Sequence, residues 1–216
     1  MKKQLLLLIF CSVCIRVFMQ QDPEAKKILD QAAEKTKSYR TIQLSYKLTV
    51  DDRIEKTSSE SEGKLRIKGD SYRLDAEESV VYFNGKTMWT YNEDINEVII
   101  TEPDMDDEDF LSNPAKILTW YNRDFKYRYV NQTKVDGLEV HEIDLFPNNL
   151  EQPYSRIKVY IAVDDLLLHL IKSIGKDGID YSIRLYDYIT DSELSDALFT
   201  FDPAKFRKVE IVDMRF

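Results

Sequence analysis

Glycine, proline, cysteine and histidine are all scarce in this chain of 216 residues. Six glycines and six prolines exclude a collagen-like or low-complexity chain. Both cysteines, Cys11 and Cys14, lie in the first 20 residues, so the rest of the chain offers no disulfide, thiol nucleophile or cysteine-based metal site. Basic residues are also in deficit, with 30 against 39 acidic residues and a net charge of -9, which disfavours binding to a nucleic-acid backbone.

The first 20 residues have the pattern of a secretory signal peptide. Two lysines give a basic start, an apolar run follows over residues 5–15, and Arg16 ends the run. Such a run is typical of an export signal and is too short to cross a bilayer as a helix. We therefore expect residues 1–20 to be removed and residues 21–216 to fold as one exported domain.

Removal of this segment changes the charge of the chain. It takes away three cations and no anion, which leaves 27 basic and 39 acidic residues and a net charge of -12. An uncleaved membrane anchor is one alternative, and lipid attachment at Cys11 or Cys14 is another. A lipidated cysteine normally follows a small residue, but Phe10 and Val13 precede these two.

Hydrophobic periodicity predicts one helix followed by a series of strands. Asp22 is a good N-cap for a helix over residues 23–39, whose apolar residues recur every three or four positions. From Thr41 the period changes to two, and turn signals such as Asn84-Gly85 separate the segments. A second short helix is expected from Pro114. The total is ten or eleven antiparallel strands, and such a sheet tends to curl into a barrel or half-barrel.

Catalytic and metal-binding patterns are mostly absent. His141 and His169 each lie inside an expected strand, where a lone histidine is more often structural than catalytic. No nucleophile-elbow, zinc-protease or phosphate-loop motif occurs. The acidic run over residues 102–109 lacks the glycine and spacing of an EF-hand loop, and we interpret it as a solvated connector. We expect no enzyme activity, no metal site and no cofactor.

Two apolar helix faces and one apolar sheet face remain to be buried. They can pack together as an ordinary core, or a curved sheet can enclose an apolar cavity beneath the helices. A packed core and a lipid cavity have the same pattern in sequence. On periodicity alone we therefore favour the ordinary core.

Six stretches follow one another in an informative order behind the export signal. They are Ala25–Leu29, Gly63–Lys68, Tyr72–Leu74, Asn84–Asn92 with its Gly-Lys-Thr-x-Trp-x-Tyr pattern, Asn113–Leu118, and Phe199–Pro203 with its Phe-x-Phe-x-Pro ending. Together these stretches resemble the periplasmic lipoprotein carrier family (LolA), and the likeness extends over residues 23–215.

The resemblance implies a fold and a function. The implied fold is mainly β (α+β), an unclosed antiparallel β-barrel with a helical lid over an apolar cavity. The implied function is that of a soluble carrier in the periplasm of a Gram-negative bacterium. Such a carrier takes acylated lipoproteins from an inner-membrane ABC lipoprotein-release transporter to the outer membrane, where a receptor is a further candidate partner. We expect a monomer that binds no nucleic acid.

The resemblance also guides the choice of site residues, each of which is equally compatible with an ordinary core. The expected lining of the cavity is Leu44, Tyr46, Leu48, Leu65, Ile67, Leu74 and Trp89. The expected inner face of the lid is Ile28, Leu29, Ile117, Leu118 and Trp120. Many family members place an arginine that latches the lid where this chain has Gly69 and Asp70, so Lys68 and Arg73 are the candidate replacements.

Two other classes of function stay open. One is a related exported half-barrel that binds lipid or glycolipid as a receptor, which a lipid-anchoring cysteine after the cleaved signal would favour. The other is an exported hydrolase with an unrecognised acidic site, which would lose its activity on removal of a single carboxylate.

The export signal gives the first testable prediction. N-terminal sequencing of the exported protein should place its first residue between Gln20 and Asp22. Recovery of exported protein that retains Met1 would show that the segment is an anchor rather than a cleaved signal.

Overall fold

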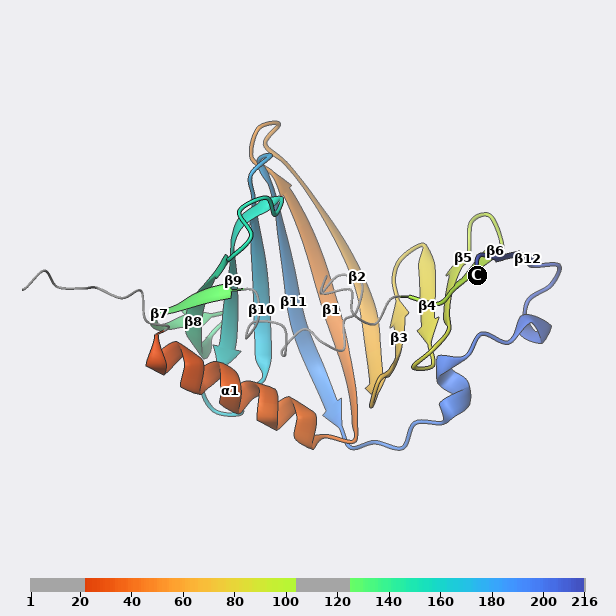
Figure 1. Ribbon diagram of the computed structural model, residues 1–216, viewed down its shortest axis with the longest axis horizontal. Coiled ribbons are helices and arrows are strands. Elements are labelled where there is room, and N and C mark those ends of the chain that lie inside the picture. Colours follow the sequence, from red (N-terminus) through yellow and green to blue (C-terminus); the bar gives the residue numbers. More distant parts are fainter. Residues whose placement is uncertain (1–21, 104–124, 216) are drawn as a thin grey trace, which may run out of the picture.

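The computed structural model describes residues 22–103 and 125–215, which form one curved β-sheet accompanied by an α-helix (Figure 1). The expected leader, the acidic run from residue 104 and the expected second helix lie outside the described residues. The helix is α1 (Pro23–Ser38), and two 3-10 helices, η2 (Asp196–Phe199) and η3 (Pro203–Lys205), precede the last strand.

Twelve strands make up the sheet of the described residues. They are β1 (Thr41–Asp52), β2 (Thr57–Lys68), β3 (Ser71–Asp75), β4 (Ser79–Phe83), β5 (Met88–Asn92), β6 (Glu97–Thr101), β7 (Phe125–Val135), β8 (Leu138–Pro147), β9 (Tyr154–Ala162), β10 (Leu168–Gly175), β11 (Ile179–Thr190) and β12 (Glu210–Asp213). Figure 1 shows the long central strands β1, β2 and β11 as a fan, with the short strands β3 to β6 on one side.

The sheet is open, as the resemblance to the carrier family implies. Its strand order is β12-β6-β5-β4-β3-β2-β1-β11-β10-β9-β8-β7, so β12 and β7 are the two edges and do not pair with each other. All neighbours are antiparallel except β12, which adds to β6 in parallel. The sequence predicted ten or eleven antiparallel strands, and the parallel β12 completes the twelve.

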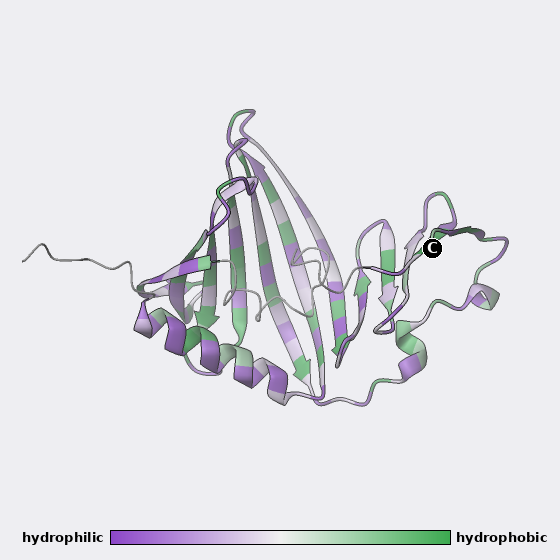
Figure 2. Ribbon diagram, in the orientation of Figure 1, coloured by the Kyte–Doolittle hydropathy of each residue, from purple (hydrophilic) through white to green (hydrophobic). Residues whose placement is uncertain are grey.

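The main hydrophobic core lies between the concave face of the sheet and α1. The apolar stripe of the helix (Ala25, Ile28, Leu29, Ala32 and Ala33) belongs to one buried cluster with residues from β1, β2 and β7 to β11. Along the strands, hydrophobic and hydrophilic residues alternate (Figure 2). This alternation has the period that places successive side chains on opposite faces of a sheet.

A second apolar cluster occupies the opposite face of the short strands β4 to β6. It contains Val80, Tyr82, Tyr91, Val98 and Phe201. Phe201 belongs to the C-terminal segment, and its ring lies 5.7 Å from that of Tyr82 and 5.6 Å from that of Tyr91. The C-terminal segment therefore covers the convex side of this half of the sheet.

Asp22 fixes the start of α1 to the edge of the sheet. Its Oδ1 accepts hydrogen bonds from the backbone N–H groups of Glu24 (2.9 Å) and Ala25 (3.2 Å), as an N-cap does. Its Oδ2 accepts a third from the backbone N–H of Tyr129 on β7 (2.9 Å). Burial acts to raise the pKa of the Asp22 carboxyl, but these three donors, Tyr129 first, hold its pKa below the ordinary value of 3.8.

Replacement of Asp22 by Ala should lower the free energy of unfolding by about 1–2 kcal/mol, because the helix loses its cap. A group whose pKa is depressed in the folded state stabilises fully above its unfolded pKa, and this contribution is lost as the pH falls through the folded pKa. The difference between wild type and variant in urea unfolding should therefore be largest at neutral pH and shrink in acid. Glu24→Ala, which removes an exposed acid from the same turn, is the control and should change stability by less than about 0.5 kcal/mol. An effect of Asp22→Ala no larger than that of the control would contradict the bridging role.

Candidate functional site

The candidate site is the concave face of the sheet, where strand register aligns apolar side chains in rows. One row runs from Leu44 on β1 through Leu65 on β2 and Leu74 on β3 to Val81 on β4. A second row contains Ile42, Ile67, Tyr72, Phe83 and Met88. Because Tyr46 and Leu48 follow Leu44 at intervals of two on β1, they share the same face. Six of the seven residues predicted to line the cavity are thus brought together.

The six residues differ in burial, which separates core from accessible wall. Leu44 and Leu65 are each only 7% exposed and belong to the buried cluster. Tyr46, Ile67 and Leu74 are half-buried at the margin of that cluster. Leu48 is also half-buried, one step further along β1, and pairs with Ile183 on β11 and Ser61 on β2. We therefore assign the accessible wall to the half-buried residues and treat Leu44 and Leu65 as core.

Tyr46 lies flat against the sheet because the residue opposite it is a glycine. Gly63 pairs with Tyr46, and a Cβ atom built on Gly63 would lie 2.4 Å from the Tyr46 hydroxyl oxygen and 2.2 Å from the carbonyl oxygen of Asp75. The missing side chain lets the tyrosine ring cross β2, and its hydroxyl donates a hydrogen bond of 3.4 Å to the Asp75 carbonyl. Burial, and to a smaller extent the Asp75 charge, raises the pKa of Tyr46, so this wall residue stays neutral.

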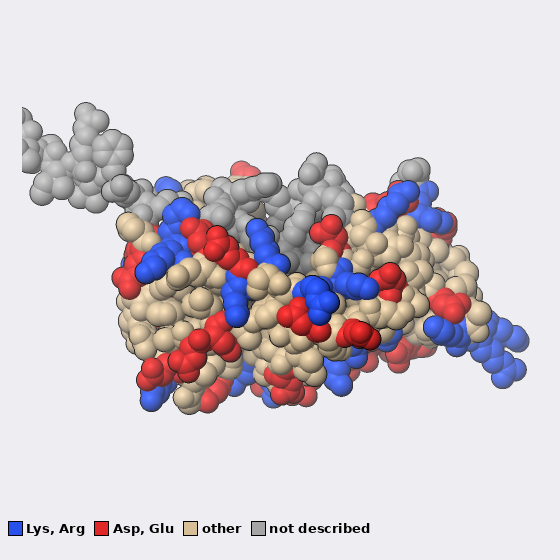
Figure 3. Space-filling model, turned by 90° about the horizontal axis from the view of Figure 1, so that it is seen from below, with Lys and Arg blue, Asp and Glu red and all other residues tan. Residues whose placement is uncertain are grey.

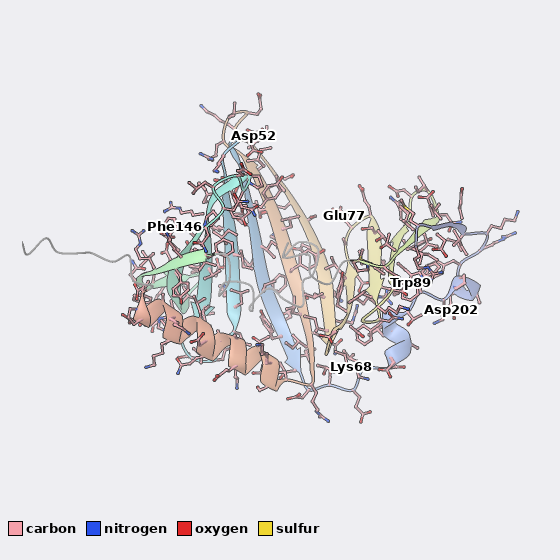
Figure 4. All side chains as sticks on the ribbon, viewed as in Figure 1. Asp52, Lys68, Glu77, Trp89, Phe146 and Asp202 are labelled. Atoms are coloured by element: carbon pink, nitrogen blue, oxygen red, sulfur yellow. The ribbon has the colours of Figure 1, made fainter. Side chains whose placement is uncertain are left out.

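Trp89 is on the other face, contrary to our assignment of it to the cavity. It pairs with Tyr82 on β4 and packs against the second apolar cluster. Figure 4 places it on β5, on the side of the C-terminal segment that carries Asp202. Its neighbour Met88 takes the concave position instead, opposite Phe83. The assignment of Trp89 to the cavity was wrong by one residue, because consecutive residues of a strand lie on opposite faces of the sheet.

The structure places two of the five predicted lid residues. Ile28 and Leu29 are 6% and 2% exposed and face the main core from α1. Ile117, Leu118 and Trp120 lie outside the described residues, so their place on the lid stays a prediction.

The two candidate latch residues have partners in other parts of the molecule. The Lys68 ammonium donates to the carbonyl of Leu194 (2.9 Å) and to Asp196 (2.6 Å), and so ties the end of β2 to the C-terminal segment (Figure 4). The Arg73 guanidinium binds Asp75 (2.7 Å) and lies 4.8 Å from the centre of the Tyr82 ring, on the convex face. These contacts give both residues a structural explanation that does not involve α1.

Sequence reasoning missed the aromatic and aliphatic residues that complete the concave face. Tyr72 and Phe83 are almost fully buried there, and their rings lie 5.2 Å apart. Burial raises the pKa of Tyr72 to about 12, so it too is neutral at physiological pH. The alternation in residues 72–83 was the signal that could have identified them. It shows which residues share a face of the sheet, but it does not show which face is concave.

The two histidines of the described residues do not share a polar partner. His141 Nδ1 lies 3.2 Å from the Tyr129 hydroxyl oxygen, and His169 Nε2 lies 3.3 Å from Asp136 Oδ2, so each histidine has its own partner. Burial lowers the pKa of His141. Within the part of the chain that the structure describes, no cluster of three or more His, Cys, Asp or Glu residues could hold a metal ion.

Comparisons with known proteins identify the family. The model of the family "Outer membrane lipoprotein carrier protein LolA" matches residues 37–202. The chain belongs to the LolA family. Comparison with curated proteins found no match. No helix in residues 22–103 and 125–215 has the length and apolar character that crossing a membrane would need.

Among the solved structures that match this chain, two are similar to it over most of their length. One is an uncharacterised conserved protein of Thermus thermophilus, with a TM-score of 0.61, 13% identity, and coverage of 88% of this chain and 99% of the other. The second is the lipoprotein LppX of Mycobacterium tuberculosis, with a TM-score of 0.52, 11% identity, and coverage of 81% and 98%. At these identities the likeness establishes the open half-barrel fold.

Arginine at two positions of β1 should separate core from wall. Leu44→Arg buries an unpaired charge and should lower the free energy of unfolding by about 3–5 kcal/mol. Leu48→Arg should cost less than about 1.5 kcal/mol, because a half-buried position lets the guanidinium reach water. Thermal and urea unfolding of the two variants measure this difference. Equal losses of stability at the two positions would show that the concave face is closed core throughout.

Proposed function

We propose that this protein is a periplasmic carrier that binds the acyl chains of lipoproteins on the concave face and ferries them from the inner to the outer membrane. The observation that carries this proposal is the partly accessible apolar wall of Tyr46, Leu48, Ile67 and Leu74 in an unclosed sheet of the LolA family. The proposed partners are acylated lipoproteins, an inner-membrane ABC lipoprotein-release transporter and an outer-membrane receptor.

The physical chemistry of acyl chains supports binding rather than catalysis as the activity of this surface. Each methylene removed from water is worth about 0.8 kcal/mol, so several chains favour an apolar surface by tens of kcal/mol. A carrier needs apolar area and a cover that can move, and it needs no catalytic group. In keeping with this, burial raises the pKa of Tyr46 on the wall and keeps its hydroxyl neutral, and we propose that the protein is not an enzyme.

The contact between α1 and the sheet suits a movable cover. Three of the five buried residues on its apolar stripe are alanines, which bury little area, and only Ile28 and Leu29 are large. A fully buried Leu or Ile side chain is worth about 1.5–3 kcal/mol, so two of them hold the helix moderately. Acyl chains that occupy the same surface could replace these contacts at little net cost in buried area.

A lipid- or glycolipid-binding receptor module is the second candidate. It is favoured by the shared fold of LppX, which is itself described as a lipoprotein. The two candidates differ in cargo, because a carrier holds an acylated protein and a lipid-binding module holds free lipid.

Native mass spectrometry of protein purified from the cells that export it should show a bound acylated lipoprotein. A complex with free lipid alone would support the receptor module instead. Protein with neither cargo, even after incubation with detergent-solubilised lipoprotein, would contradict both candidates.

Release of lipoprotein from energised inner-membrane vesicles tests the transport step. Leu48→Arg should reduce release by about tenfold or more, because a charge at the wall opposes entry of acyl chains. Ile54→Arg is the matched control, since Ile54 is 70% exposed in the turn between β1 and β2, and its release should equal that of wild type. Normal release by a folded Leu48→Arg protein would remove this residue from the acyl-chain path.

A further inference from the structure

The convex face of β7 to β9 holds a layered group of charges. The buried carboxylate of Asp144 on β8 is 1% exposed. Its Oδ2 accepts hydrogen bonds from Arg128 on β7 (2.8 Å) and Arg156 on β9 (3.4 Å), and its Oδ1 lies 3.1 Å from the Lys158 ammonium. Lys158 also binds Glu142 (2.5 Å). Asp144 thus holds three cations from two flanking strands.

Burial separates the two carboxylates from the two arginines, whereas Lys158, at 18% exposed, is nearly as buried as Glu142. The side chains of Asp144 and Glu142 are 1% and 15% exposed, whereas those of Arg156 and Arg128 are 38% and 59% exposed. The carboxylates therefore lie beneath, and the guanidinium groups reach the solvent.

Two more lysines extend the group along the strands. Lys126 on β7 is exposed opposite Phe146, and Lys172 on β10 is half-buried opposite Lys158. We call these seven residues the β7–β10 cationic patch: Lys126, Arg128, Arg156, Lys158, Lys172, Asp144 and Glu142. With five cations and two mostly buried carboxylates it is locally positive, in a chain whose net charge without residues 1–20 is -12. By contrast, both signs are interspersed on the face seen from below in Figure 3.

The apolar residues of this face are covered. Tyr160 and Leu170 are 8% and 3% exposed, and the Arg128 guanidinium lies 5.6 Å from the centre of the half-buried Phe146 ring. Among the large exposed hydrophobic residues of the described chain, Val130 at the β7 bulge, 39% exposed, is the only one on β7 to β10. Stable protein interfaces usually have aromatic or aliphatic anchors at their centre, and a patch without them suits salt-sensitive adsorption to anionic headgroups.

We propose that the β7–β10 cationic patch is a docking surface for a bilayer that contains anionic phospholipids. The patch includes residues of β7, which is one of the two unpaired edges of the described sheet. Docking here would bring the convex face beside this edge against the bilayer, while the remaining negative charge of the protein keeps the contact weak and reversible. Adsorption through this patch is independent of the cargo that the concave face binds.

Co-sedimentation with vesicles tests the proposal. Wild-type protein at low salt should partition onto phosphatidylcholine vesicles with about 30% phosphatidylglycerol at least tenfold more strongly than onto pure phosphatidylcholine. High salt should abolish the preference. Lys126→Glu/Lys172→Glu should reduce the partition coefficient at least about tenfold, since neither lysine is needed to pair Asp144. Lys27→Glu/Lys64→Glu is the control, because it makes the same change in net charge at two exposed lysines elsewhere.

The outcomes separate the proposal from its competitors. Absence of a phosphatidylglycerol preference, or an equal loss in the control, would overturn it. Patch-dependent binding to polyglutamate without vesicle binding would also overturn it, and would assign the surface to an acidic protein. Should the double glutamate variant fail to fold, as judged by thermal unfolding, Lys126→Gln/Lys172→Gln should give a smaller loss in the same direction, and no loss would count against the proposal. Native mass spectrometry should detect the same bound cargo in wild type and in all of these variants. The carrier proposal is therefore tested separately.

Discussion

An open sheet exposes one apolar face that its own strands cannot cover. In this protein β12 and β7 end the sheet without pairing, so the concave face must be buried by other means. Among the described elements α1 covers part of it with a narrow stripe in which alanine predominates. The surface that remains half-buried is where the proposed acyl-chain cargo would lie. The apolar surface for this cargo is left because the sheet does not close.

The alternation of side chains between the two faces of a strand decides which residues take part in that surface. Met88 and Trp89 are neighbours in sequence, yet one belongs to the concave row and the other to the cluster under the C-terminal segment. The same rule acts through Gly63, whose missing side chain allows Tyr46 to lie across β2 and form part of a flat wall. A single-residue change of register would exchange the two faces and destroy both clusters.

Charge is arranged by the same sheet on its other face. Alternation that sends Ile143 and Leu145 into the main core sends Glu142 and Asp144 to the convex side, where cations from β7 and β9 surround them. Burial of the carboxylates leaves Arg128 and Arg156 outermost, whereas Lys158 is itself largely buried. The two faces of β8 thus serve different purposes, one for apolar packing and one for an electropositive surface.

The sequence alone determined the local elements and the family. The N-cap at Asp22, the apolar stripe of α1 and the alternation of β1 depend on near neighbours, so their patterns are visible in the chain. The polar start of β2 is a strand because backbone pairing with β1 holds Thr57 opposite Asp52. Only the tertiary structure decided which face of each strand is concave, that Trp89 faces away, that Leu44 is core while Leu48 is accessible, and that Lys68 binds the C-terminal segment. Those facts depend on partners far away in sequence, and a period of two carries no information about them.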